Sequence, residues 1–463
     1  MPAIITKDFR VHNAKQFEES FGETADTYYL AIGRPQAFAD NQAFNDGTDA
    51  SPPTPVDSVG SVEYYAYDDF LSAKKITSSD VSLVIPRRNW TTGTVYDYYR
   101  HDYGDINTAG SVISSDSGAT SLYDATFYVM NSTFDVYKVI DNNSGGASTV
   151  EPSGNKSTSV FSTGDSYKWK YMYSLSASEQ ANFLSTDFMH VSTESSDFST
   201  TAGAIEHVKI TAGGSGGTNG TYTGVDIRGD GSSGKATIVV ASNAVSSVTI
   251  TTAGSGYTYA SVKASDFGSV SGADIDFIIS PPGGHAADVV TELGGFFVMT
   301  NVDLTQADGS GDFSTGNDFR RIALLRNPTD STTGSTASAT TLDATKSITF
   351  SGTPGSFQAD EKITQATTGA VGFVVDFNST TKVLRYVQPQ FADQGVDSDG
   401  NLTAFASTHT VTGATSSATG TPSSHDTTPE LTHDTGDILY IENRKPISRA
   451  ADQTENVKLI VEF

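Results

Sequence analysis

Tracts rich in Gly, Ser, Thr and Asp run through most of this chain and leave little room for long helices. The 463 residues include 43 glycines, and only 18% of them are Asp, Glu, Lys or Arg. Ser, Thr, Asp and Gly are weak helix formers, because their side chains compete for backbone hydrogen bonds or leave the backbone too free. Apolar residues make up 37% of the chain, enough to build cores. The sequence therefore predicts a mainly β protein, of the α+β kind, with few short helices.

Three segments carry helix signals. Residues 13–22 place two phenylalanines four positions apart and end at a glycine, which is typical of a short helix. Residues 67–76 are expected to form a second helix. Residues 176–184 open with Ser176 and Glu179 in the spacing of a capping box, which predicts a helix start.

Short runs of β-branched and aromatic residues predict strands in the same part of the chain. The run DSYKWKYMYSL alternates aromatic with polar residues, the period-two signature of a half-buried strand. ATFYVMN and FDVYKVID follow one another closely and are expected to be adjacent strands. The predicted strands fall within residues 26–35, 82–90, 125–131, 134–141 and 165–175.

Residues 205–290 contain an internal repeat. VKITAGGSGGT begins at Val208 and VTITTAGSGYT begins at Val248, and SGKATIVV and SGADIDFII follow later in the two units. Two units of about forty residues indicate a duplicated β module, in which glycines serve the turns and Val/Ile pairs serve a core.

Residues 331–430 contain a second repeat, between Ser/Thr-rich flanks. FQADEKITQATTGAVG and FASTHTVTGATSSATG align so that two phenylalanines, two β-branched residues and two glycines fall in register. We predict a small antiparallel β module with these residues at equivalent places: Phe357 with Phe405, Ile363 with Val411, and Gly372 with Gly420.

These observations predict one β-rich body interrupted by two inserted modules. The body comprises residues 1–204, 291–330 and 431–463. The first insertion is residues 205–290, and the second is residues 331–430.

The formal net charge of -26 argues against broad contact with nucleic acid or with anionic membranes. Disulfides and thiolate metal sites are excluded, because the chain has no cysteine. The N-terminus lacks the apolar run of a signal peptide, and no stretch approaches about 18 consecutive apolar residues, so we expect no secretion and no membrane insertion.

Positive charge gathers in three short stretches of this acidic chain. Each stretch is expected to bind an anion, to pair with the protein's own carboxylates, or to pair with those of another subunit. Arginine is favoured at protein interfaces, where its planar group forms paired hydrogen bonds and its stem packs on aromatic rings. The candidate interface residues are Arg87, Arg88 and Trp90; Arg320, Arg321 and Arg326; and Arg444, Lys445 and Arg449.

No motif in the sequence predicts an enzyme, a cofactor or a metal site. GDGSSGKAT at 229–237 has phosphate-loop spacing but carries Ala236 where Ser or Thr is needed, and a predicted strand follows it. RGD at 228–230 and DSDGN at 397–401 are interpreted as turns, and His285 as a loop histidine. The sequence has no HExxH motif, and no GxSxG nucleophile elbow, with its serine at a turn from a strand into a helix, is predicted.

Four blocks of the sequence resemble a known family. LVIPRRNW, GDSYKWKYMYSL, DFRRIALLRNP and the C-terminal GDILYIENRKPISRAADQTENVKLIVEF are similar, in the same order, to stretches of the baseplate wedge subunit of T-even-type contractile-tailed bacteriophages, the product of gene eight. IITKDFR, YLAIGRP and PPTPVDSV near the N-terminus are similar as well. The two Gly/Ser/Thr-rich modules depart from the family pattern.

The resemblance implies a structural, non-enzymatic protein of the phage tail baseplate, assembled in the host cytoplasm. It further implies a β-sandwich body, a homodimer, and contacts with other wedge proteins, with tail fibre components as further candidate partners. Two alternatives stay open. One is an adhesin that binds host glycans through the inserted modules, with Tyr257 and Tyr259 as an aromatic platform. The other is a polysaccharide-degrading tail protein, which requires two acids about 5 to 9.5 Å apart in a cleft.

Overall fold

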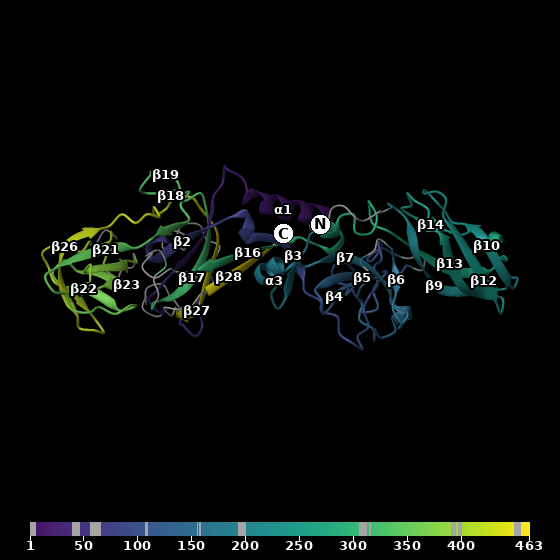
Figure 1. Ribbon diagram of the computed structural model, residues 1–463, viewed down its shortest axis with the longest axis horizontal. Coiled ribbons are helices and arrows are strands. Elements are labelled where there is room, and N and C mark those ends of the chain that lie inside the picture. The colour runs from purple at the N-terminus through teal and green to yellow at the C-terminus, as the bar shows by residue number, and fades with distance from the viewer. Residues whose placement is uncertain are drawn as a thin grey trace. The chain divides into compact units, whose positions relative to one another are not determined.

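The structure is a computed structural model that describes most of the chain, and strands dominate it (Figure 1). The helices of the described part are short: α1 (Lys7–Ser20), α3 (Ala177–Phe183) and α4 (Val289–Leu293). The mainly β prediction is confirmed. The described residues are 6–38, 47–55, 66–106, 110–154, 156, 159–192, 201–304, 313, 316–389, 395–396, 401–448 and 455–463.

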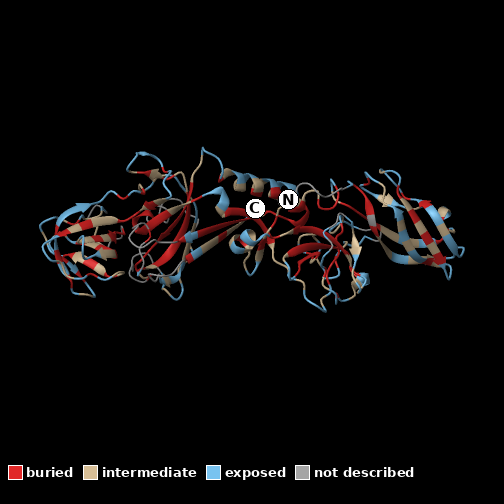
Figure 2. Cartoon of the chain, viewed as in Figure 1, coloured by how far each residue is buried: buried red, intermediate tan, exposed pale blue. Residues whose placement is uncertain are grey.

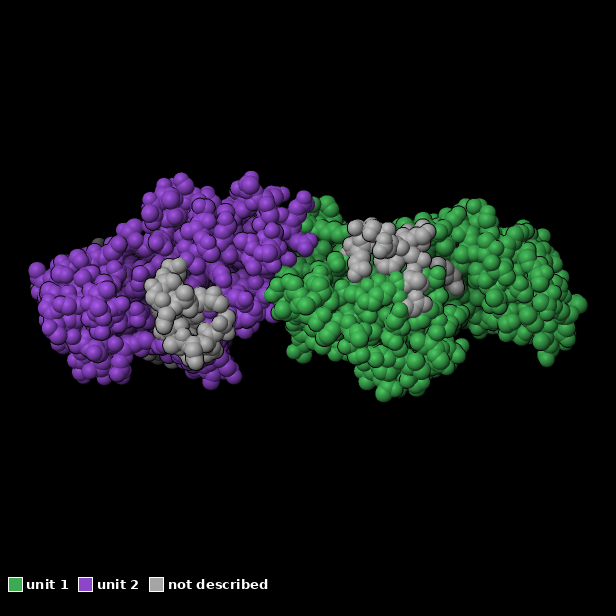
Figure 3. Space-filling view, viewed as in Figure 1, with its two compact units in different colours: residues 1–17, 82–299, 460–463 green, residues 18–81, 300–459 purple. Residues whose placement is uncertain are grey.

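The chain divides into two compact units (Figure 3). Unit 1 comprises residues 1–17, 82–299 and 460–463, and unit 2 comprises residues 18–81 and 300–459. Each unit therefore takes segments that lie far apart in the sequence, and each is described separately below.

Unit 1 contains a four-stranded sheet of order β4-β5-β7-β6, and the strands predicted from ATFYVMN and FDVYKVID are neighbours in it. A second four-stranded sheet has the order β28-β16-β3-β8. The bounds are β4 Tyr128–Met130, β5 Asp135–Asp141, β6 Phe161–Ser162 and β7 Lys168–Ser174; and β3 Val81–Pro86, β8 Phe188–His190, β16 Phe297–Leu304 and β28 Glu455–Glu462.

The prediction that β7 is half-buried is wrong. All five residues from Trp169 to Tyr173 are buried, including Lys170, which is 2% exposed. The strand lies between β5 and β6, and both of its faces are covered. A lysine in a buried strand must find a polar environment inside the protein, and sequence alternation alone does not reveal this.

Two of the three predicted helices are confirmed and one is wrong. α1 covers most of residues 13–22, and α3 begins at the predicted capping box, with the Glu179 N–H donating to the Ser176 hydroxyl at 3.3 Å. Residues 67–76 form a short 3-10 turn and then β2 (Phe70–Ile76). β2 is paired on both sides, by β1 and β20, and this tertiary pairing overrides a weak local preference for helix.

The module that begins at residue 205 pairs its two repeats reciprocally. β9 and β13 carry the two repeated openings, and β12 and β15 carry the two repeated endings. β9 pairs with β15, whereas β12 pairs with β13, so each repeat's opening strand is completed by the other repeat's ending strand. The bounds are β9 Ile205–Ser215, β10 Gly220–Asp226, β11 Arg228–Gly229, β12 Lys235–Ala241, β13 Ala244–Thr252, β14 Ala260–Ser261 and β15 Ser271–Ile279.

Unit 2 is built on a five-stranded antiparallel sheet of order β20-β2-β1-β17-β27. The two central strands, β1 (Tyr28–Gly33) and β17 (Asp318–Arg326), are buried almost throughout, whereas no residue of β27 (Asp437–Ser448) is buried (Figure 2). β20 spans Thr341–Asp343, and a small separate ladder joins β18 (Thr329–Asp330) to β19 (Ser335–Thr336).

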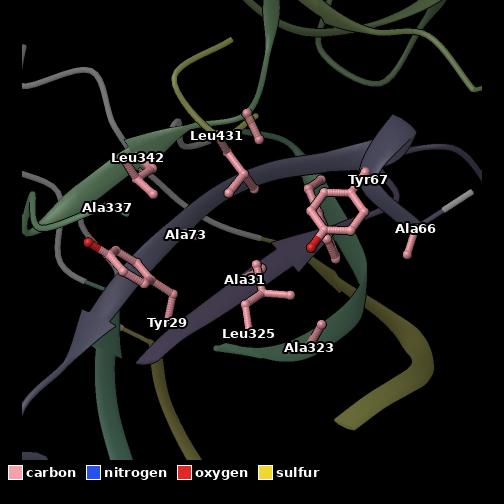
Figure 4. Close-up of a cluster of buried hydrophobic side chains, with 12 residues drawn as sticks. Tyr29, Ala31, Ala66, Tyr67, Ala73, Ala323, Leu325, Ala337, Leu342 and Leu431 are labelled. Carbon is pink, nitrogen blue, oxygen red and sulfur yellow. The ribbon is translucent and has the colours of Figure 1, made fainter. Parts of the chain in front are cut away.

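Strands of this sheet contribute side chains to a buried cluster of alanines, leucines and aromatic residues (Figure 4). Tyr29 and Ala31 project from β1, and Ala73 projects from β2. The Tyr29 hydroxyl donates to the Ala339 carbonyl at 2.7 Å, so the polar tip of this buried ring is satisfied. The small alanines let the covering segments lie close to the sheet.

The second module contains a closed antiparallel barrel of order β21-β24-β23-β22-β25-β26. All four apolar residues of the predicted repeat, two phenylalanines and two β-branched residues, are in its buried core. The bounds are β21 Lys346–Ser351, β22 Lys362–Gln365, β23 Ala370–Asn378, β24 Val383–Val387, β25 Val411–Gly413 and β26 Thr419–Asp426.

The two glycines of this repeat make room for aromatic rings. A Cβ atom at Gly372 would lie 2.8 Å from the Tyr386 ring, and one at Gly420 would lie 2.7 Å from the Phe350 ring. Both rings are buried in the barrel, so they have little freedom to move aside.

Gly420→Ala is therefore expected to destabilise the barrel by about 1–3 kcal/mol through overpacking. Hydrogen exchange followed by mass spectrometry should show faster exchange in β21 and β26. Gly164→Ala is the control, because its Cβ would meet no atom closer than 3.8 Å. Equal exchange in the wild-type protein and Gly420→Ala would contradict this account of the repeat.

A carboxyl group with a raised pKa joins the barrel to the sheet of unit 2. The Asp318 N–H, at the start of β17, donates to Asp360 at 2.9 Å. Burial raises the pKa of Asp360 to about 7, and the nearby Asp318 carboxylate acts in the same direction. The neighbouring Glu361 behaves oppositely: burial opposes its ionisation, but hydrogen bonds from Ser416 and from the Gln358 N–H lower its pKa.

Asp360→Asn is expected to stabilise the protein at pH 8 by roughly 2–4 kcal/mol, and the gain should vanish near pH 4. The folded wild-type protein binds this proton more tightly than the unfolded chain, so its contribution is complete at low pH and is lost as pH rises toward 7. Calorimetry of both proteins from pH 4 to pH 8.5 measures the difference.

Glu361→Gln serves as the control with the opposite sign. Its lowered pKa means that the carboxylate stabilises the folded protein at neutral pH and that this contribution is lost as pH falls. If the free energies of unfolding of Asp360→Asn and the wild-type protein differed by the same amount at every pH, the raised pKa of Asp360 would be contradicted.

Candidate protein interaction site

Arg88 and Trp90, in unit 1, form hydrogen bonds with other residues of the same chain. Arg88 donates to the backbone carbonyls of Ala125 and Tyr123, the second at 3.0 Å, and its guanidinium lies 4.5 Å from the centre of the Tyr128 ring. The Trp90 indole N–H donates to the Ser148 hydroxyl at 3.0 Å. Both side chains are half-buried, and their hydrogen bonds stabilise the segment that follows β3.

Arg87 follows the same pattern. It donates to the Asn89 side chain at 3.0 Å and to the Ser185 carbonyl at 2.8 Å. The first arginine stretch therefore satisfies carbonyl and amide oxygens of its own chain.

Arg320, in unit 2, is buried and pairs with carboxylates of its own chain. Its guanidinium makes two parallel bonds to Asp49, at 2.9 and 3.0 Å, and a third to Asp318 at 3.1 Å. Burial alone would raise the pKa of Asp49, but the hydrogen bond and the charge of Arg320 lower it below its ordinary value. This geometry is the paired fork that arginine makes best.

Arg321 is the second buried arginine of unit 2, and it ties together three strands of the sheet. From β17 it donates to Asp69 at 2.7 Å, immediately before β2, and to Asn443 of β27 at 3.1 Å. Asp69 is completely buried and also accepts a bond from Gln36 at 3.2 Å. Burial of Arg320 and Arg321 fits pairing within the chain, one of the alternatives that the sequence left open.

The remaining basic residues of the described stretches lie at the surface of unit 2. Arg326 pairs with Asp437 at 2.7 Å, and Arg444 pairs with Glu442 at 2.8 Å. Lys445 is exposed and has no ion-pair partner among the described residues. Arg449 lies outside the described residues. Arg444 and Lys445 are thus the candidates best placed to meet another molecule.

The surface around Arg444 also includes apolar residues that sequence reasoning did not single out. Leu439 and Tyr440, on the same strand, are 42% and 39% exposed. The stretch ILYI was interpreted as part of a strand, and its β-branched and aromatic content gives no sign of which side is covered. Adjacent exposed apolar residues and basic residues on one strand are typical of a protein contact site.

A small pocket of about 230 Å³ lies beside β27 in unit 2. Its apolar lining comes from Phe319 and Ile322 of β17, Ile447 of β27, and Val457 and Leu459 of β28. Four charged residues complete the lining, two acidic and two basic: Glu442, Glu455, Arg444 and Lys458. Burial lowers the pKa of Lys458. The pocket offers an apolar floor with balanced charges, which suits an amphipathic side chain of a protein partner.

His285 belongs to a buried polar cluster in unit 1. Lys138 bonds both His285 and Glu292, and Glu292 also accepts from the Ala286 N–H at 2.7 Å. Burial, with Lys138 and Lys170 adding to it, holds the pKa of His285 well below its usual range. The cluster lies inside the protein, where it fixes the segment that follows the first module.

Residues 228–237 form turns and strands, as the sequence analysis interpreted them. β11 and β12 flank the glycine turn, so a strand follows it where a phosphate loop needs a helix. Arg228 pairs with Asp266 at 2.7 Å, and Asp230 accepts from Thr258 at 2.6 Å, so the RGD side chains are engaged within the module. DSDGN at 397–401 lies almost entirely outside the described residues.

The two tyrosines of the adhesin alternative lie in different environments. Tyr257 is 2% exposed, and its hydroxyl donates to the Ile227 carbonyl at 3.0 Å. Tyr259 is 63% exposed. A glycan platform of both rings is therefore not formed.

Within the described ranges, no group of three or more His, Asp or Glu side chains is placed to hold a metal ion. In the same ranges, none of the helices has both the length and the apolar character needed to cross a membrane.

Comparison with known proteins finds a match to a family model. Residues 3–145 match Phage-Gp8, described as Bacteriophage T4, Gp8. The resemblance to the baseplate wedge subunit of the T-even-type phages is confirmed by this match. A search of curated proteins gives no match.

The arginine pairs of unit 2 permit a direct test of burial. Arg321→Ala should destabilise the sheet by about 3–5 kcal/mol, because it removes the guanidinium that is hydrogen-bonded to the buried Asp69 carboxylate. Arg326→Ala is the matched control on the same strand, with an expected cost of about 0–1 kcal/mol, since its partner Asp437 is exposed. Hydrogen exchange in β1 and β17 reads out both changes; similar costs for the two variants would contradict the assignment.

Proposed function

We propose that this protein is a structural component of a phage tail baseplate wedge and that it acts through contacts with other proteins. The observation that carries the proposal is the family match over residues 3–145. The T4 protein named by that family is a baseplate wedge subunit. The other blocks of sequence that resemble this family lie beyond the matched residues, in β7, β17 and β27, and support the same reading.

The surface chemistry of unit 2 supports a protein partner. β27 combines exposed Leu439 and Tyr440 with Arg444 and Lys445. Apolar contact provides affinity, while charges set orientation and exclude wrong partners. A chain with a formal net charge of -26 repels nucleic acid over most of its surface. The basic residues Arg444 and Lys445 are therefore better suited to contact acidic residues of a neighbouring protein.

The proposed partners are a second copy of this chain, other wedge proteins of the baseplate, and tail fibre components. The proposed location is the tail baseplate of the virion. The proposed role is non-catalytic, and the match to a baseplate family supports it.

The proposal is tested on purified particles of the phage that encodes this chain. Mass spectrometry of the particles should find the protein, and gold-labelled antibody against it should decorate the baseplate end of the tail. Antibody against a head protein is the control for position. Particles that lack the protein, or label on the head alone, would overturn the proposal.

A further inference from the structure

β27 is a long strand at the edge of the five-stranded sheet. It has twelve residues and pairs through one side with β17, while the sheet order places no described strand on its other side. The opposite edge of the same sheet, β20, has three residues. Natural edge strands are usually short or shielded, because an open row of backbone N–H and C=O groups invites another strand.

The pairing of β27 with β17 is regular only from Tyr440 to Asn443. It is irregular at Leu439 and again between Asn443 and Ile447, where three residues of β27 have no matched partner: Arg444, Lys445 and Pro446. Such irregularities shield a strand edge, and proline also lacks an N–H. An incoming strand would therefore find a regular template from Tyr440 to Asn443.

The sequence of β27 is complementary to itself in one antiparallel register. When Asn443 of one copy lies opposite Asn443 of another, Glu442 of each copy lies opposite Arg444 of the other. The two-fold symmetry repeats this opposite-charge pair, so it forms twice. Cross-strand charge pairs of this kind stabilise a sheet, whereas like charges opposite one another destabilise it.

The charged residues of this register also line the pocket beside the strand. Glu442 and Arg444 contribute to its lining together with Phe319 and Ile322 of β17. Leu439 and Tyr440, which are exposed in the isolated chain, lie on the same strand. The edge of β27 therefore offers apolar surface beside the charges that select the register.

We propose that a second copy of this chain docks on the free edge of β27, in antiparallel register about Asn443. The contact joins two five-stranded sheets into one continuous sheet, and it is isologous, as a closed dimer requires. The inference rests on the proposed function for the existence of a homodimer, and it adds the surface and the register.

Cysteine cross-linking tests the register directly, because the natural chain has no cysteine. The double variant Glu442→Cys/Arg444→Cys places thiols opposite one another across the contact, where a disulfide reaches. It should form covalent dimers on mild oxidation, detected on a non-reducing gel. Tyr440→Cys/Arg444→Cys, two residues out of register, and each single variant should stay largely monomeric on the gel.

Charge reversal supplies an independent measurement. Glu442→Arg or Arg444→Glu alone should weaken dimerisation roughly tenfold, because two like-charge pairs replace two opposite-charge pairs. The double variant E442R/R444E should restore dimerisation, since it exchanges the charges without changing the pairing. Lys235→Glu is the control for net charge, because Lys235 is on the first module. Sedimentation equilibrium gives the dissociation constants.

The outcomes separate the inference from the proposed function. A dimer that cross-links equally well out of register, or that ignores the charge reversals, overturns the β27 contact and leaves the homodimer standing. A chain that is monomeric in solution but present in the baseplate overturns the second copy as the occupant. Absence from the particles overturns the proposed function, whatever the oligomeric state.

Discussion

The buried pairing of Arg321 with Asp69 is the interaction on which the sheet of unit 2 depends. A guanidinium and a carboxylate inside a protein are stable only when their charges and hydrogen-bonding groups are satisfied there, because water is excluded. Arg321 meets Asp69 on one side and Asn443 on the other, so one side chain links the entry to β2 with the edge strand β27. The buried strands β1 and β17 supply the apolar setting that makes this pairing obligatory. The exposed edge of the sheet is therefore held in place from its interior.

The two inserted modules use duplicated sequence in different ways. In the first, the opening strand of each repeat pairs with the ending strand of the other, so neither half is complete alone. In the second, β22 and β25 descend from equivalent positions and pair with each other, which helps to close a barrel. Closure removes free edges altogether. Duplication thus builds one module by exchange of strand partners between repeats and the other by closure of a barrel, and repeated apolar residues contribute to both cores.

Features that depend on neighbouring residues in the chain were predicted correctly from the sequence, whereas features that depend on tertiary contacts were missed. The capping box at Ser176, the strand after the glycine turn at 229–234 and the core residues Ile363 and Val411 all follow from patterns that span a few residues. The helix predicted for residues 67–76 was wrong, because β2 is stabilised by pairing with β1 and β20 on its two sides. Of the candidate interface residues, the sequence could not separate buried Arg321 from exposed Arg444, since both stand in strands beside similar residues. Leu439 and Tyr440 were missed because edge position is a property of the sheet and has no local signature.

The contrast between the two edges of this sheet bears on why β27 is long. A strand of three residues, such as β20, ends a sheet at little risk, because it offers few free hydrogen-bonding groups. A strand of twelve residues with exposed Leu439 and Tyr440 carries a risk of unwanted association. An exposed edge of this length avoids unwanted association when it pairs with only one kind of partner strand, and the residues of β27 provide such selectivity. Pro446 and Lys445 narrow the registers available, and Glu442 and Arg444 penalise those in which like charges meet. In a protein that acts alone, the length and exposed apolar residues of β27 would favour aggregation. In a component of an assembly, the same features provide a specific contact surface.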